Sequence, residues 1–197
     1  NNPSVTPGND EYISQVVAAI GDGRIAGQPS LVVRTHPWDR DNDYRSSLAG
    51  HPSARLERSF TPPREATVFE CLGTRADVQH YGALMRHADL LLNIASTTSL
   101  DGIAADVPVV NLAFDAIPVH PDASVARYCE YTHYKPILAT GAVRVARSFE
   151  ELCRMASRDL ADPTVDADAR AAARASFLTY TDGSAAGRVA EALLAMC

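Results

Sequence analysis

The chain has 197 residues, of which 46% are hydrophobic and 21% are charged, an ordinary composition for a globular domain, and no apolar run approaches the ~20 residues of a membrane helix. The net charge of −6, with 18 scattered Lys and Arg, argues against nucleic acid as a partner, because duplex binding needs a concentrated basic face. The four cysteines form no C-x-x-C pair and follow no secretory signal, so we expect reduced thiols in a cytoplasmic protein.

The first predicted elements are a helix and a strand. Apolar residues at helical spacing predict a helix over residues 11–20. Glycine and proline turns then lead into a strand over residues 31–34, which is followed directly by a Thr-His-Pro sequence. Residues 39–63 are polar and carry prolines, which predicts a loop with room for one short helix. A second strand is predicted over residues 67–70.

The middle of the chain has the pattern strand, polar turn, helix, strand. A helix over residues 78–87 precedes a hydrophobic strand at 89–93, and a small polar turn follows at 95–99. A short helix from Leu100 and a second strand at 107–111 complete the pattern. This order of elements is typical of parallel α/β sheets, in which a crossover helix joins neighbouring strands.

The last third of the chain is predicted to be mainly helical. We expect a loop at 114–121, a helix at 123–131, a short strand at 143–145 and helices at 149–158, 168–178 and 183–196. The alternation of strands and helices predicts an α/β fold, a Rossmann-like three-layer α/β/α domain with a parallel sheet. We expect residues 1–197 to form one domain, with residues 166–197 as C-terminal helices that pack on it.

Two polar segments are predicted to share one edge of this sheet. Ligands of such sheets bind beyond the carboxyl ends of the strands, and both His36 and the turn Ser96-Thr-Thr-Ser99 follow a strand. The start of a helix offers unpaired N–H groups and a positive dipole end to an anion. Ser and Thr are also common helix N-caps, so a simply capped helix remains an alternative to a phosphate site.

Several segments together carry a resemblance to a known family. They are residues 33–37 (VRTHP), residues 81–89, residues 96–101 (STTSLD), residues 107–110 (VPVV) and the closing motif 182–189 (DGSAAGRV). In order and spacing they resemble the C-terminal, nucleotide-binding domain of GT-B glycosyltransferases, most of all the CDP-glycerol glycerophosphotransferase-like and bacterial capsule-polysaccharide transferase group. The resemblance implies one half of a GT-B fold that binds a CDP-, CMP- or UDP-linked donor.

The resemblance also implies which residues contact the donor. A histidine stiffened by the following proline, together with a row of hydroxyls, would hold the donor's phosphates. These residues are His36, Pro37, Ser96, Thr97, Thr98 and Ser99.

Three charged residues have two interpretations each. Asp101 stands where related transferases place an acidic residue for the ribose or donor sugar, but a first-turn Asp also complements the helix dipole. Arg34 is a candidate phosphate ligand, although a strand Arg more often pairs with a neighbouring carboxylate. We expect Arg188 to form a surface salt bridge rather than to bind a ligand.

The resemblance implies a partner that this chain does not contain. GT-B enzymes have two Rossmann-like domains and usually place the acceptor site and the catalytic base on the N-terminal one. We therefore expect a donor domain without its N-terminal acceptor domain, which binds nucleotide weakly and transfers little by itself. His36 is the one candidate catalytic residue, and the others are unassigned.

The intact bacterial enzyme would transfer a sugar or polyol phosphate from a nucleotide-activated donor to a surface polysaccharide or glycan. We expect no cofactor, no metal and no transmembrane segment. The expected location is the cytoplasm or the inner face of the cytoplasmic membrane, and peripheral membrane contact of the parent protein stays open.

Other functions fit less well. No G-x-G-x-x-G follows a strand, no G-x-S-x-G surrounds Ser96, and no H-x-x-x-H or H-E-x-x-H pair is present. A UDP-N-acetylglucosamine 2-epimerase-like enzyme shares the fold but would need further carboxylates, whereas this turn has only Asp101. A non-catalytic α/β binding module is the third hypothesis.

One segment is richer in rings than a connector requires. Residues 120–135 include Tyr128, Tyr131, His133 and Tyr134. Such rings can stack on a base or sugar, or pack the segment against the sheet. Of the two interpretations we favour core packing.

Overall fold

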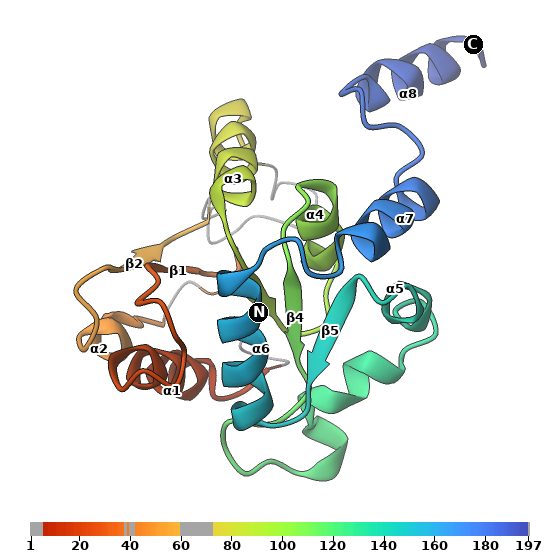
Figure 1. Cartoon of the computed structure of the whole chain (residues 1–197). Helices are drawn as coiled ribbons and strands as arrows, with labels where there is room; N and C mark the ends of the chain where they lie inside the picture. Colours follow the sequence, from red (N-terminus) through yellow and green to blue (C-terminus); the bar gives the residue numbers. More distant parts are fainter. Residues whose placement is uncertain (1–5, 38, 40–41, 60–72, 197) are drawn as a thin grey trace.

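The computed structural model describes residues 6–37, 39, 42–59 and 73–196. Within these residues helices and strands alternate along the chain, as Figure 1 shows. The elements are α1 (Asn9–Gly21), β1 (Leu31–Arg34), α2 (Arg45–Leu48), β2 (Ala54–Glu57), α3 (Arg75–His87), β3 (Leu91–Asn93), α4 (Thr98–Ala104), β4 (Val109–Leu112), the 3-10 helices η2 (Pro121–Ala123) and η3 (Val125–Glu130), α5 (Lys135–Ala139), β5 (Val143–Ala146), α6 (Phe149–Ala161), α7 (Ala167–Phe177) and α8 (Ala185–Leu194).

The strands of the described residues form two parallel sheets. One has the order β1-β2 and the other β3-β4-β5. Arg34 pairs in register with Glu57 at the end of the first sheet, and Asn93 pairs with Asn111 in the second. The predicted α/β class with parallel strands is therefore confirmed. The strand predicted at 67–70 lies outside the described residues, as do Cys71 and Cys197.

Helices cover both faces of the larger sheet. The central strand β4 is buried along its whole length, and its alternate residues enter two different cores. Val110 and Leu112 pack with residues of α1 and α6, including Val16 and Leu152. Val109, on the opposite face, packs with residues of α4, α5 and α7, including Ile103. The result is a three-layer α/β/α arrangement around β3-β4-β5.

Three local elements differ from the sequence prediction. Strand β2 falls in the segment expected to be a loop. Its four residues alternate between apolar and charged side chains, and they form a strand by pairing with β1. The helix expected at 123–131 is divided into η2 and η3, since the backbone of Ser124 is extended (ψ 135°) and its side chain caps η3 at Ala126. Helix α5 was not expected, and it carries Pro136 in its first turn.

The two C-terminal helices differ in their packing. Helix α7 packs against α4 and buries Ala173 and Arg170. Arg170 donates to Asp106 (3.0 Å) and to the carbonyls of Val165 (2.6 Å) and Pro163 (2.8 Å), so its buried charge is compensated. Helix α8 has no buried residue and stands apart in Figure 1. The large apolar side chains of α8, among them Val189 and Leu194, are exposed.

No helix of the described residues is long and apolar enough to cross a membrane. The described cysteines, Cys129 and Cys153, are free and buried, and burial raises the pKa of both thiols. Both therefore act as packing groups, in agreement with their scattered positions in the sequence.

The close approach of α4 to the sheet depends on Gly102. A Cβ atom at this position would lie 2.7 Å from Cγ2 of Val109 and 3.0 Å from Cδ2 of Leu91. We predict that Gly102→Ala lowers the free energy of unfolding by about 1–3 kcal/mol, because the added methyl overpacks a filled core. Gly187→Ala on α8 is the control, since nothing lies within 4 Å of its Cβ position. Equal urea midpoints for the two variants would contradict this role of Gly102.

Candidate functional site

Buried hydrogen bonds hold the polar turn between β3 and α4. The amides of Asn93 and Asn111, at the ends of β3 and β4, are joined by a hydrogen bond from Asn111 Nδ2 to Asn93 Oδ1. Both Nδ2 atoms also donate to Ser99 Oγ, each at 3.2 Å. The Tyr134 hydroxyl closes the network, at 2.7 Å from Ser99 Oγ and 2.6 Å from Asn111 Oδ1, to which it donates. One network thus joins β3, β4, α4 and the start of α5.

The hydroxyls of the turn are not equivalent. Ser99 is fully buried, and its hydroxyl forms hydrogen bonds inside the domain that link β4 to α4. Ser96 Oγ accepts from Asn93 Nδ2 (3.2 Å) and from the Thr98 N–H (3.3 Å), and its residue is only partly buried. Thr97 is exposed. Contact of Ser96, Thr97 and Thr98 with a phosphate stays a prediction.

A second set of contacts joins the end of β1 to α4. Arg34 forms an ion pair with Glu57, and His80 Nε2 lies 3.1 Å from the second carboxylate oxygen of Glu57. The Arg34 guanidinium also lies over the Tyr81 ring, 5.0 Å from its centroid, and the Tyr81 hydroxyl donates to Asp101 at 2.8 Å. Arg34 therefore pairs with a neighbouring carboxylate, the alternative that its strand position favours.

The charges of this set are modified by burial. Burial lowers the pKa of Arg34 and raises that of Tyr81, and the hydrogen bond to Asp101 raises the Tyr81 pKa further. Burial also raises the pKa of Asp101, against the opposing effect of the Tyr81 hydrogen bond. Asp101 accepts a hydrogen bond from a hydroxyl group here, the kind of contact expected of it toward a ribose or sugar, and the donor is Tyr81 of α3.

His36 lies just beyond β1 next to a buried carboxylate. Its carbonyl accepts the Asp39 N–H at 2.8 Å, and Asp39 is 5% exposed. The Asp39 carboxylate accepts from Tyr44 (2.5 Å) and Asn42 (2.7 Å), and burial together with this contact raises the pKa of Tyr44 to about 12. Burial lowers the pKa of His36 and so favours the neutral imidazole, with Asp39 opposing the shift. Pro37 follows in a turn and is partly buried.

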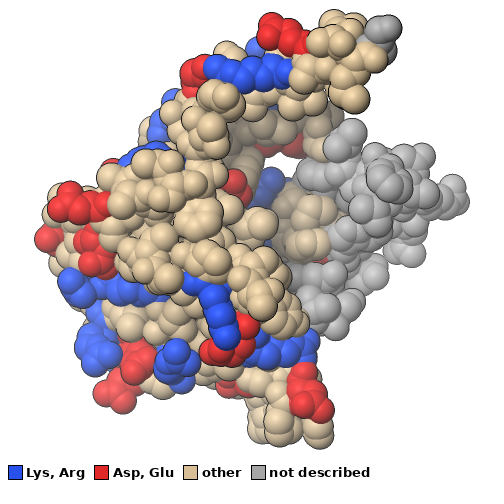
Figure 2. Space-filling model, turned by 90° about the vertical axis from the view of Figure 1, so that its right-hand side faces the viewer, with Lys and Arg blue, Asp and Glu red and all other residues tan. Residues whose placement is uncertain are grey.

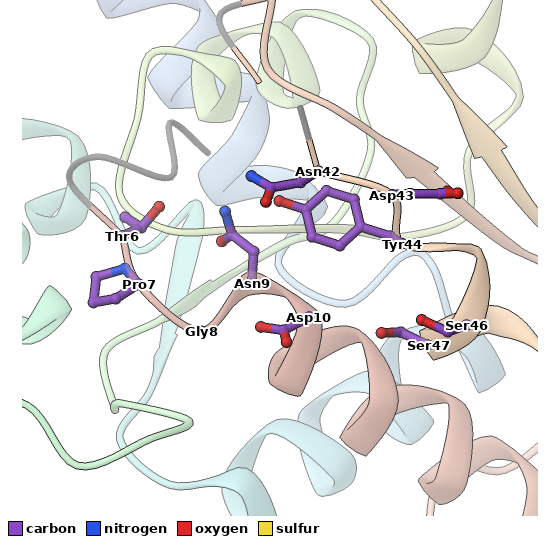
Figure 3. A pocket seen from close by; sticks show the side chains of 10 residues that line it. All are labelled: Thr6, Pro7, Gly8, Asn9, Asp10, Asn42, Asp43, Tyr44, Ser46 and Ser47. Atoms are coloured by element: carbon purple, nitrogen blue, oxygen red, sulfur yellow. The ribbon is translucent and has the colours of Figure 1, made fainter. Parts of the chain in front are cut away.

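A polar cleft of about 260 Å³ adjoins this loop (Figure 3). It lies between the start of α1, at residues 6–10, and residues 42–47. The Tyr12 hydroxyl of α1 donates a hydrogen bond to the Phe114 carbonyl, so the loop after β4 contacts α1 as well. Among the described residues that line it are the carboxylates Asp10 and Asp43 but no Lys or Arg. These described residues suit neutral hydroxyl groups better than a phosphate.

Charges of both signs are interspersed among the described residues on the face that Figure 2 shows. Among the described residues, no three His, Cys, Asp or Glu side chains come together as metal ligands. Arg188 pairs with Asp182 (2.5 Å), which confirms the expected surface salt bridge. Comparisons of the chain with protein-family models, curated proteins and solved structures gave no match.

Sequence reasoning did not assign site roles to Tyr134, Tyr81 and Asn93. Tyr134 lies 35 residues after Ser99, and no local pattern links the two. The one available signal was an amide at the end of each of two apolar strands, since a buried amide must find polar partners.

Loss of the Tyr134 hydroxyl should destabilise the domain. Tyr134→Phe keeps the ring but leaves Ser99 and Asn111 short of a buried hydrogen-bond partner, so we expect a loss of about 1–3 kcal/mol in the free energy of unfolding. Urea denaturation measures it. The control is Tyr180→Phe, at a side chain that is 59% exposed, for which we expect a change within about 0.5 kcal/mol. A Tyr134→Phe midpoint equal to that of the control would contradict the network.

The lowered pKa of His36 predicts acid sensitivity. The ordinary pKa of histidine is 6.5, and below this pH the unfolded chain binds the proton at His36 more readily than the folded chain does. The neutral His36 therefore stabilises the fold fully above pH 6.5, and this stabilisation is lost as the pH falls further. In His36→Gln the free energy of unfolding should fall less between pH 7.5 and 5.5 than in the wild type. If urea denaturation shows the same fall in the free energy of unfolding for His36→Gln and the wild type, His36 is not desolvated in the folded chain.

Proposed function

We propose that this chain is the donor-nucleotide-binding domain of a transferase that moves a sugar or polyol phosphate from a nucleotide-activated donor to a glycan acceptor. The observation that carries the proposal is the position of two motifs. His36-Pro37 begins two residues after β1 ends, and the Ser96–Ser99 turn begins three residues after β3 ends. β1 is parallel to β2 in one sheet and β3 is parallel to β4 in the other, and the carboxyl ends of parallel strands are the usual ligand edge of an α/β fold.

The chemistry at this edge would be electrostatic. An acceptor hydroxyl attacks the activated donor, and the nucleotide phosphate departs with its negative charge. The hydroxyls of Thr97 and Thr98 and the neutral His36 imidazole can donate hydrogen bonds to such a phosphate. The buried network around Ser99 fixes the turn beforehand, so little ordering would be needed when the donor binds.

A specific observation favours a second candidate, the non-catalytic binding module. Arg34, Ser99 and Asp101 all have partners within the domain. A site with fewer free polar groups can hold a ligand without activating it.

Nucleotide titration tests the proposal. Isothermal calorimetry and thermal shift against CMP, CDP, UMP, UDP, GDP and ADP should show one preferred nucleotide. Each of His36→Ala and Ser96→Ala should weaken its binding roughly 2- to 12-fold, the value of one hydrogen bond. His87→Ala is the matched control, because His87 precedes β3 and lies at the opposite, amino end of the strands.

The outcomes separate the two candidates. Binding that is weakened at His36 and Ser96 but not at His87 supports a donor site. Binding that none of the three variants changes would place the ligand elsewhere. No binding of any nucleotide by the wild type would overturn the donor-domain proposal and leave the binding module.

A further inference from the structure

The segment after β4 exposes aromatic rings that the sequence interpretation assigned to the core. Tyr134 is 3% exposed and packs in the core, as expected. Tyr131, however, is 41% exposed, and His133 beside it is also exposed. Core packing is therefore the wrong interpretation for these two rings.

These rings are held in fixed positions. Tyr131 lies edge to face with Tyr128, at 5.4 Å between centroids and 83° between planes, and 5.6 Å from the His133 ring. Arg127 lies 4.9 Å from the centroid of Tyr128 and donates to its hydroxyl at 3.0 Å. Rings that are already packed lose little side-chain entropy when another ring stacks on them. We call Arg127, Tyr128, Tyr131 and His133 the aromatic platform.

The aromatic platform adjoins the Ser/Thr turn. The Tyr134 N–H donates to the Tyr131 carbonyl at 2.9 Å, and the Tyr134 hydroxyl reaches Ser99. The length of one tyrosine side chain thus separates the backbone of the platform from the turn. In Figure 1, the arrowheads of β4 and β5 point to the end of the molecule where the segment between β4 and α5 lies. Platform and turn therefore belong to one edge.

We propose that the aromatic platform stacks on the base of the bound nucleotide, with the exposed ring of Tyr131 as the contact. The inference rests on the proposed function, since it assigns the base of the same donor whose phosphates lie at the turn. A nucleobase is planar and has a π face, and base–aromatic stacking needs no particular base. His133 and Arg127 supply polar groups at the rim of the platform.

The test compares ligands with and without a base. The nucleoside diphosphate that binds most tightly among CDP, UDP, GDP and ADP is titrated by calorimetry into the wild type, Tyr131→Ala and Tyr131→Phe. Tyr131→Ala should weaken binding about 5- to 150-fold, and Tyr131→Phe should bind like the wild type because it keeps the ring. Ribose 5-phosphate, which has no base, should bind the wild type and Tyr131→Ala equally.

Tyr180→Ala is the matched control. Tyr180 is 59% exposed and also has an arginine over its ring, Arg188 at 3.9 Å, but it lies between α7 and α8. It should bind the diphosphate like the wild type, and urea midpoints confirm that all variants fold.

Four outcomes overturn the inference. One is unchanged affinity in Tyr131→Ala while the wild type binds, which leaves the proposed function intact. Another is an equal loss of affinity in Tyr131→Phe and Tyr131→Ala, which would indicate a contact of the Tyr131 hydroxyl. An equal loss of affinity for ribose 5-phosphate in Tyr131→Ala would indicate a contact with the sugar. Absence of nucleotide binding by the wild type overturns the proposed function and this inference together.

Discussion

The hydrogen-bonded pair of amides formed by the partly buried Asn93 and the fully buried Asn111 is the constraint on which the candidate site depends. An amide inside a protein costs stability unless its donors and acceptors are all satisfied, so the chain around the pair must supply partners. Ser99 and Tyr134 supply them, from the start of α4 and the start of α5. This requirement sets the geometry of the Ser/Thr turn and positions the segment that carries Tyr131. A ligand at this edge would meet a surface shaped by interior hydrogen bonds.

Two further interactions keep α4 in its place. Gly102 lets the helix approach β3 and β4 closely, and the Asp106 carboxylate after the helix receives Arg170 from α7. Arg170 is 2% exposed, and a buried guanidinium destabilises the fold unless hydrogen bonds and an opposite charge compensate it. Because α4 carries both Ser99 and Asp101, these contacts link the packing of the second face of the sheet to the chemistry of its edge.

The sequence predicted the elements better than the contacts between them. Strand β1 has the predicted bounds, because a short apolar run between turns leaves little choice. His36 follows β1 and the Ser96–Ser99 turn follows β3, as the order of residues along the chain predicted, and their contact with a common ligand stays a prediction. That Ser99 faces inward and pairs with Tyr134 could not be predicted, because the partner comes from another element. Strand β2 could not be predicted either, because it forms by pairing with β1. Nor could the exposure of Tyr131, which depends on the path of η3.

Backbone amide NMR during nucleotide titration tests the central claim most directly, because it locates the ligand without any substitution. The account predicts that chemical-shift changes concentrate after β1, β3 and β4, at His36, Thr97 and Tyr131 and their neighbours. Changes concentrated at the amino ends of the strands, around His87, or on α8 would contradict it, since no parallel strand of the described residues ends there.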